Sequence, residues 1–174
     1  DGELLEHAEY VNNYYGTSLK VIQEKLDAGV DVLLDIEVQG AAKVRSKCPD
    51  AVLIFIIPPS FEELSRRLRG RNTDSEEVIA GRLQKAREEY KQIPKYDYLV
   101  VNDKVSEAAG EIIAILTAES CRTKHRIICV KLTGKLFHHL LYTARIMEIY
   151  NRIRTTWDNR VDTVNLFCVF FKIC

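Results

Sequence analysis

Three side chains in the first eighteen residues could together hold a purine base and a small phosphate. The segment DGELLEHAEYVNNYYGTS places an acid, Glu6, before a tyrosine, Tyr15, and a hydroxyl residue, Thr17, in a Gly-Thr-Ser run that predicts a turn. A carboxylate can accept hydrogen bonds from N1–H and the exocyclic amino group of guanine, and adenine lacks both donors on that edge. Such a site would discriminate against the wrong base by roughly 10⁴-fold or more. In the alternative interpretation, Glu6 is a solvated surface acid and Tyr14 and Tyr15 are ordinary strand residues.

Arginines recur farther along the chain, within RRLRGRNTDSEEVIAGRLQKAREE, at Arg67, Arg71 and Arg82. A planar guanidinium neutralises charge on phosphoryl oxygens and binds them in a bidentate manner. A mobile arginine segment could close over bound nucleotides, exclude water and reopen to release product. The alternative is a helix with a solvated basic face next to an acidic one.

The composition favours one ordinary globular domain and excludes several other classes. The chain has 174 residues, 47% of them hydrophobic, and five cysteines without the CxxC spacing of a metal site, so we expect no metal ligands and no disulfide framework. A segment of about 18 apolar residues and a signal peptide are both absent, which predicts a cytoplasmic protein without membrane contact. Because the single methionine is Met147, we expect the chain to belong to a longer gene product.

Strands and helices are predicted to alternate, which indicates an α/β fold with a parallel sheet and right-handed crossovers. The N-cap residue Ser60 and the acids after it indicate one helix start, and Asp74-Ser75 indicates another. A strand buried on both faces is a nearly continuous apolar run, as in AVLIFII. The predicted helices cover residues 19–28, ended by Gly29, then 41–47, 61–70, 76–91 and 105–119; the predicted strands cover 32–36, ended by Gln39-Gly40, then 51–57 and 98–101, the last of these also buried, and residues 69–74 form a polar connector.

These motifs resemble those of guanylate kinases. Guanylate kinases carry a near-identical early segment, in which the glutamate contacts guanine and the second tyrosine and the following hydroxyl lie at the GMP phosphate. The resemblance implies that Glu6, Tyr15 and Thr17 bind GMP. The family's next motif, D-I-D-x-Q-G, is similar to Asp35-Ile36-Glu37-Val38-Gln39-Gly40 here, and it implies that Asp35 and Glu37 lie beside the same nucleotide, Glu37 being one methylene longer than the usual aspartate.

The arginine segment resembles the family's lid, R-L-x-G-R-G-T-(D/E), which is followed by K/R-R-L. Arg67, Arg71 and Arg82 occupy the arginine positions and are implied to be catalytic, while Asn72 and Gly81 depart from the usual residues without removing a charge. A later V-x-N-D element implies that Asn102 lies near the adenine of ATP, although capping of a turn is an equally good account of this asparagine.

The resemblance implies an enzyme that transfers the terminal phosphoryl group of ATP to GMP with Mg²⁺, giving ADP and GDP in purine nucleotide metabolism. GMP and ATP are the implied partners, with no nucleic acid, and the oligomeric state is left open. Because no GxxxxGK[ST] loop occurs in the 174 residues, we expect weak or no activity from this chain alone. Two alternatives are a guanylate-kinase-like binding module, which uses the pocket for phosphorylated peptides, and an inert fragment.

The resemblance covers residues 1–122 and implies a P-loop NTPase-like sheet whose amino-terminal strand and phosphate loop are missing. The strands at 32–36 and 52–57 would then flank an empty position, where each unpaired buried amide costs about 1–3 kcal/mol. Residues 1–122 carry a net charge of −6 and residues 123–174 carry +6, so we expect the latter to form a separate helical or irregular tail. The tail is either an unrelated translation or an authentic extension that packs on the core; in one variant, residues 164–173 fill the vacant position in the sheet.

Overall fold

The computed structural model describes the greater part of the chain, and two compact units account for it. The first unit comprises Asp1–Ile56, Arg82–Leu99 and Asn165–Cys174, and the second comprises Ile57–Gly81 and Val100–Val164. For residues 4–17 and 168–171 only the backbone is described. The described residues are 4–10, 13–28, 30–70, 74–123, 151 and 168–171.

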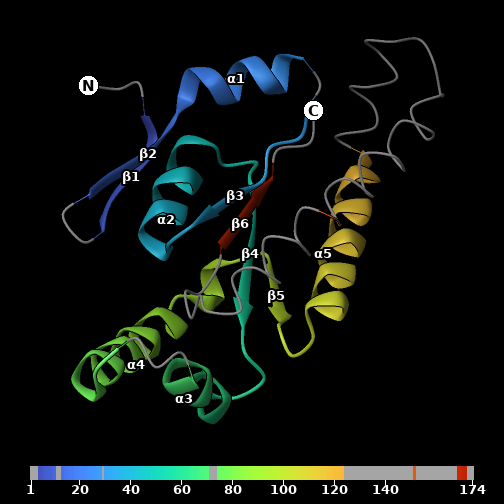
Figure 1. Ribbon diagram of the computed structural model, residues 1–174. Coiled ribbons are helices and arrows are strands. Elements are labelled where there is room, and N and C mark those ends of the chain that lie inside the picture. Colours follow the sequence, from blue (N-terminus) through green and yellow to red (C-terminus); the bar gives the residue numbers. More distant parts are fainter. Residues whose placement is uncertain are drawn as a thin grey trace. The chain divides into compact units, whose positions relative to one another are not determined.

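Helices and strands alternate through the middle of the chain (Figure 1), which confirms the predicted α/β class. Each predicted helix and strand between residues 19 and 120 is present, with its ends moved by a few residues at most. The elements are β1 (Leu4–Tyr10), β2 (Asn13–Ser18), α1 (Leu19–Asp27), β3 (Leu34–Ile36), α2 (Val38–Lys47), β4 (Val52–Ile57), α3 (Phe61–Gly70), α4 (Glu76–Tyr90), η1 (Ile93–Lys95), β5 (Tyr98–Val101), α5 (Val105–Ser120) and β6 (Cys168–Phe171).

The first unit opens with an antiparallel hairpin of β1 and β2. Its second strand contains the Gly-Thr-Ser run, so the predicted turn at this place is wrong: the residues are extended and lead directly into α1. Ser18 caps α1, because its hydroxyl accepts a hydrogen bond from the backbone N–H of Val21 at 3.5 Å. Helix α1 then buries Ile22 and Leu26, which are one turn apart.

A four-stranded sheet follows in the order β3-β6-β4-β5. Strands β3 and β4 both run antiparallel to β6, and are therefore parallel to each other. Strand β5 runs parallel to β4, since Asp97 donates to the carbonyl of Leu53 at 2.9 Å and Asn102 donates to that of Ile57 at 2.7 Å, in the same direction along both strands. Three of the four strands therefore form the predicted parallel set.

The position between β3 and β4 is filled rather than empty. Strand β6, from the end of the chain, lies between them with antiparallel pairing on both sides (Figure 1). The expectation of an empty position is therefore wrong, and the variant in which residues 164–173 fill it is confirmed for Cys168–Phe171. The backbone groups of β3 and β4 on this side thus have a partner strand.

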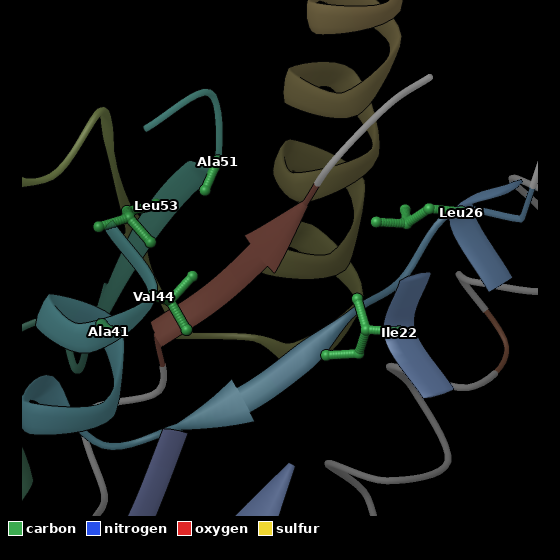
Figure 2. Packing of buried hydrophobic residues seen from close by; sticks show 6 residues of the cluster. All are labelled: Ile22, Leu26, Ala41, Val44, Ala51 and Leu53. Atoms are coloured by element: carbon green, nitrogen blue, oxygen red, sulfur yellow. The ribbon is translucent and has the colours of Figure 1, made fainter. Parts of the chain in front are cut away.

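A hydrophobic cluster joins the helices of the first unit to the sheet. Its buried side chains come from α1, α2, the residue before β4 and Leu53 of β4 (Figure 2), and Leu34 and Ile36 of β3 pack against them. Strand β4 is buried at every residue from Val52 to Ile56, as its apolar sequence predicted. The six residues of the cluster are Ile22, Leu26, Ala41, Val44, Ala51 and Leu53.

Two boundaries and one burial prediction need correction. Helix α2 begins at Val38, so Gln39-Gly40 lies inside the helix instead of ending the strand, and β3 begins at Leu34 instead of residue 32. Gly40 is buried within the first turn of α2, so it belongs to the packed side of the helix together with Ala41 and Val44. Strand β5 is buried only at Val100 and exposes its neighbours, because its consecutive side chains face opposite sides of the sheet.

In the second unit, local capping sets the helix starts as the sequence predicted. The hydroxyl of Ser60 accepts from the backbone N–H of Glu63 at 3.1 Å at the start of α3, and Ser75 accepts from Val78 at 3.4 Å at the start of α4. The helix predicted at 105–119 is present as α5, and it buries Ala108, Ala109, Ile112 and Leu116. Residues 71–73 of the predicted connector and residues 124–150 and 152–167 of the tail lie outside the described residues, whereas residues 69 and 70 belong to α3.

Candidate functional site

The hairpin brings two of the three predicted base and phosphate ligands opposite each other. In the register of β1 and β2, Glu6 is the partner of Thr17, and Tyr15 is the partner of Ala8, two residues farther along β1. Glu6 and Thr17 lie eleven positions apart in the sequence. The pairing of β1 with β2 makes them neighbours across the hairpin. The side chains of these residues lie outside the described part of the structure.

Glu37 lies at the junction between β3 and α2, directly after the strand that contains Asp35. Its backbone is extended and its carboxylate makes no cap hydrogen bond to α2. Instead, its Oε2 accepts a hydrogen bond from Nζ of Lys85, on α4, at 3.0 Å. The carboxylate is 28% exposed and is paired with the ammonium group of Lys85.

Lys85 also approaches Glu89, one helical turn farther along α4, at 3.7 Å. Burial raises the pKa of Glu89, the positive charge of Lys85 opposes this, and the negative charge of Glu37 adds to it. One ammonium group therefore serves two carboxylates. Sequence reasoning missed Lys85, although its spacing of four from Glu89 is a recognisable helical ion pair; its contact with Glu37 had no local signal.

Arg67 lies within α3, and its guanidinium is held by several acceptors of the second unit. It donates to Glu63 at 2.6 Å, to the carbonyl of Asn102 at 2.9 Å and to that of Asp103 at 3.3 Å. Arg66 donates to the same Glu63 carboxylate at 2.7 Å. Hydrogen bonds from Arg66 and Arg67 lower the pKa of Glu63 to about 2. Arg67 is therefore anchored in a helix rather than placed on a loop.

The described residues do not test whether the three predicted arginines meet at one site. Arg67 belongs to the second unit, whereas Arg82, partly buried on α4, belongs to the first unit with Glu37 and Lys85. Arg71 lies outside the described residues. The prediction that all three act on one phosphoryl group therefore stays a prediction.

Asn102 follows β5 and contributes its backbone to the anchoring of Arg67. Its side-chain oxygen is buried and makes no hydrogen bond within the described part of the chain. A turn-capping role through this oxygen, the alternative interpretation of Asn102, is thus not seen.

Neither a metal centre nor a membrane span is found where the structure is described. No group of three or more histidine, cysteine, aspartate or glutamate side chains within the described ranges could hold a metal ion. No helix of these ranges is long and apolar enough to cross a membrane.

An open cavity of about 740 Å³ lies elsewhere in the first unit, between α1 and the segment that joins α2 to β4. Lysines and acids are mixed along its wall, which includes Lys20, Glu24, Lys47 and Asp50. None of the predicted site residues lines it, and we assign it no role.

Comparison with known proteins places this architecture in a family. The family model for guanylate kinase matches residues 1–119. The chain is 56% identical over 122 residues to the guanylate kinase of Streptococcus agalactiae, covering 70% of this chain and 58% of the relative, and 56% identical over 122 residues to that of Lactococcus lactis, covering 70% and 60%. The crystal structure of guanylate kinase from Anaplasma phagocytophilum has a TM-score of 0.58 and 40% identity, covering 70% of this chain and 58% of that one. The chain thus spans about three fifths of the length of these relatives, and it belongs to the guanylate kinase family.

Proposed function

We propose that this chain carries the GMP-binding part of a guanylate kinase, an enzyme that moves the terminal phosphoryl group of ATP to GMP. The observation that carries the proposal is the match of the family model over residues 1–119, which includes every predicted GMP ligand. A cytoplasmic setting is part of the same proposal.

In this proposal Glu6 accepts hydrogen bonds from N1–H and the amino group of guanine, and Tyr15 and Thr17 hold the phosphate of GMP. The pairing of Glu6 with Thr17 in the hairpin supports a shared binding surface. Asp35 and Glu37 lie beside the nucleotide, and Lys85 holds the carboxylate of Glu37 in place. An ion pair restricts the rotamers of both partners, so the acceptor side is organised before GMP arrives.

A phosphate oxygen of GMP attacks the γ-phosphorus of ATP, the bond to the bridging oxygen breaks, and ADP leaves with the electron pair. The family's chemistry depends on positioning and on neutralisation of phosphoryl charge. We assign the charge neutralisation to Arg67, Arg71 and Arg82, and the contact with adenine to Asn102. Mg²⁺ would be supplied with ATP and would neutralise charge on its phosphoryl oxygens.

A polypeptide of these 174 residues should turn over slowly, because its sequence contains no GxxxxGK[ST] run to wrap the phosphates of ATP. GMP binding and phosphoryl transfer are therefore separable in this chain. We expect measurable GMP binding together with little ADP production in a coupled assay. Ordinary kinase rates from the purified 174-residue chain would refute the assignment of weak activity.

Isothermal titration calorimetry tests the binding proposal. The full chain is titrated with GMP, AMP and a phosphoserine peptide, and GMP should bind with the highest affinity because only guanine offers two donors to Glu6. The matched pair of variants is Glu6→Gln and Glu9→Gln, two acids of the same strand β1. Only Glu6→Gln should remove the preference for GMP over AMP.

Two outcomes contradict the proposal. Tighter binding of the phosphoserine peptide than of GMP would favour a binding module of the guanylate-kinase-like type. Equal loss of GMP preference in both variants would show that Glu6 has no special contact with the base. A cooperative thermal unfolding transition, measured on each sample, separates these outcomes from a chain that does not fold.

A further inference from the structure

Strand β6 (Cys168–Phe171) lies beyond the residues that the family model matches, yet it occupies an interior position of the sheet. It is hydrogen-bonded to a neighbour on each side, β3 on one and β4 on the other. The register is continuous on both sides. The paired residues are Leu34 with Phe170, Asp35 with Val169 and Ile36 with Cys168 on β3, and Val52 with Phe171, Leu53 with Phe170, Ile54 with Val169 and Phe55 with Cys168 on β4.

The hydrogen bonds of Leu53 show which backbone N–H and C=O groups of β4 point toward β6. Its N–H donates to Oδ2 of Asp97 at 2.8 Å and its carbonyl accepts from the N–H of Asp97 at 2.9 Å, so Leu53 directs both groups toward β5. Successive strand residues direct their backbone groups to opposite sides, which turns those of Ile54 toward β6. Because Ile54 is the partner of Val169, these two residues form a hydrogen-bonded antiparallel pair.

The apolar sequence of residues 166–171 suits an interior position in the sheet. Residues 52–56 of β4 are all buried, so this part of the sheet is covered on both faces. A strand in such a place needs apolar residues at consecutive positions instead of alternate ones. Residues 166–171 have the sequence LFCVFF and meet this requirement.

We propose that residues 168–171 are an internal complementing strand, and that the slot between β3 and β4 is a binding site for one extended apolar segment in antiparallel orientation. The recognition is that of strand addition: main-chain hydrogen bonds on two edges supply the affinity, and apolar residues on both faces supply the selectivity. The segment outside the family domain thereby completes the sheet of that domain within the same chain.

Hydrogen exchange in the full chain tests the pairing. Val169→Pro removes the N–H that is donated toward Ile54, whereas Val169→Thr keeps this N–H and a β-branched side chain. In the Val169→Pro chain, the amide of Ile54 should exchange roughly tenfold faster or more, because its strand partner is disrupted. The Val169→Thr chain should retain the protection of the parent chain at Ile54. Equal protection of Ile54 in the proline variant and the parent would overturn the proposal.

A disulfide experiment tests the register without weakening the strand. The backbone groups of Val169 face β4, so those of its neighbour Cys168 face β3, and Cys168 forms a hydrogen-bonded pair with Ile36. Such antiparallel pairs have Cα atoms about 5.5 Å apart, within the range that a disulfide bridges. The variant Ile36→Cys is compared with Leu34→Cys, which is opposite Phe170; both native side chains pack against the same cluster. The background carries serine in place of the other four cysteines, Cys48, Cys121, Cys129 and Cys174.

Mild oxidation at low protein concentration should give an intramolecular crosslink in the Ile36→Cys chain and little in the Leu34→Cys chain. Crosslinked dimers alone would mean that β6 is exchanged between two copies, which overturns the proposal of a strand contributed in the same chain. Equal crosslinking of both variants, or none in either, would overturn the register. The kinase proposal is unaffected by these outcomes, since neither experiment depends on nucleotide.

Discussion

Nζ of Lys85 lies 3.0 Å from Oε2 of Glu37, although 48 positions separate the two residues in the sequence. Glu37 stands where the family's motif usually has aspartate, and its additional methylene extends the carboxylate toward α4. The ion pair thus connects a residue of the proposed GMP site to the helix that carries Arg82.

Replacing Lys85 by alanine should weaken GMP binding by up to about fivefold, because partly exposed ion pairs contribute about 0.2–1 kcal/mol. The loss should diminish at high salt, where the pair is screened. Calorimetry at low and high ionic strength measures both effects. The matched control is Lys91→Ala, which breaks an exposed pair with Glu88 of 2.6 Å. An equal loss of affinity in both variants would contradict a specific role for Lys85.

Glu63 should make the stability of the chain depend on pH in the acid range. Hydrogen bonds from Arg66 and Arg67 lower its pKa from 4.5 to about 2, so its contribution is complete above pH 4.5 and is lost as the pH falls toward 2. The Glu63→Gln variant should be less stable than the parent at pH 7, and this difference should shrink between pH 4.5 and 2. Urea unfolding across this range measures it.

Glu77→Gln is the control for Glu63, because Glu77 is also an acid in the first turn of a helix. Both substitutions remove a favourable charge near a helix N-terminus, but only Glu63 has two arginine donors. A parallel pH dependence of the two variants would assign the effect to the helix dipole instead.

Ser60→Ala should destabilise the chain by about 1 kcal/mol, the usual cost of removing an N-cap hydroxyl. The Ser60 hydroxyl is 3.1 Å from the backbone nitrogen of Glu63, and its loss leaves that N–H without its acceptor. Denaturant unfolding measures the difference. Ser106→Ala, at an exposed position inside α5, is the control and should be neutral or slightly stabilising. A similar loss in both variants would show that the cap has no particular effect.

Arg45→Ala should cost about 1 kcal/mol of unfolding free energy, because the part-buried carbonyl of Ala51 loses its donor. The guanidinium binds the carbonyls of Pro49 at 3.0 Å and Ala51 at 2.7 Å and is paired with Asp97. Lysine should not restore the loss, since one ammonium group does not reproduce the planar fork of donors. Ser46→Ala, the exposed neighbour on α2, serves as the control. Full stability in an Arg45→Lys chain would contradict this explanation.

The sequence by itself determined the elements whose signals are local. Ser60 and Ser75 preceded acids and apolar periodicity, the run from Val52 to Ile57 was apolar throughout, and these patterns correctly indicated two helix starts and a buried strand. Local steric and hydrogen-bonding rules suffice for such features. The early motif that contains Glu6, Tyr15 and Thr17 and the arginine positions were likewise visible as short patterns, and they indicated the family.

Only the tertiary structure decided which distant segments meet. The pairing of β6 with β3 and β4 depends on the facing edges of those two strands, and these strands are far from β6 in the sequence. The contact of Lys85 with Glu37 and the inclusion of Gly40 in α2 depend on how helices pack against the first unit's sheets. These contacts satisfy backbone hydrogen bonds and fill space between different elements. The local sequence pattern of each element does not encode them.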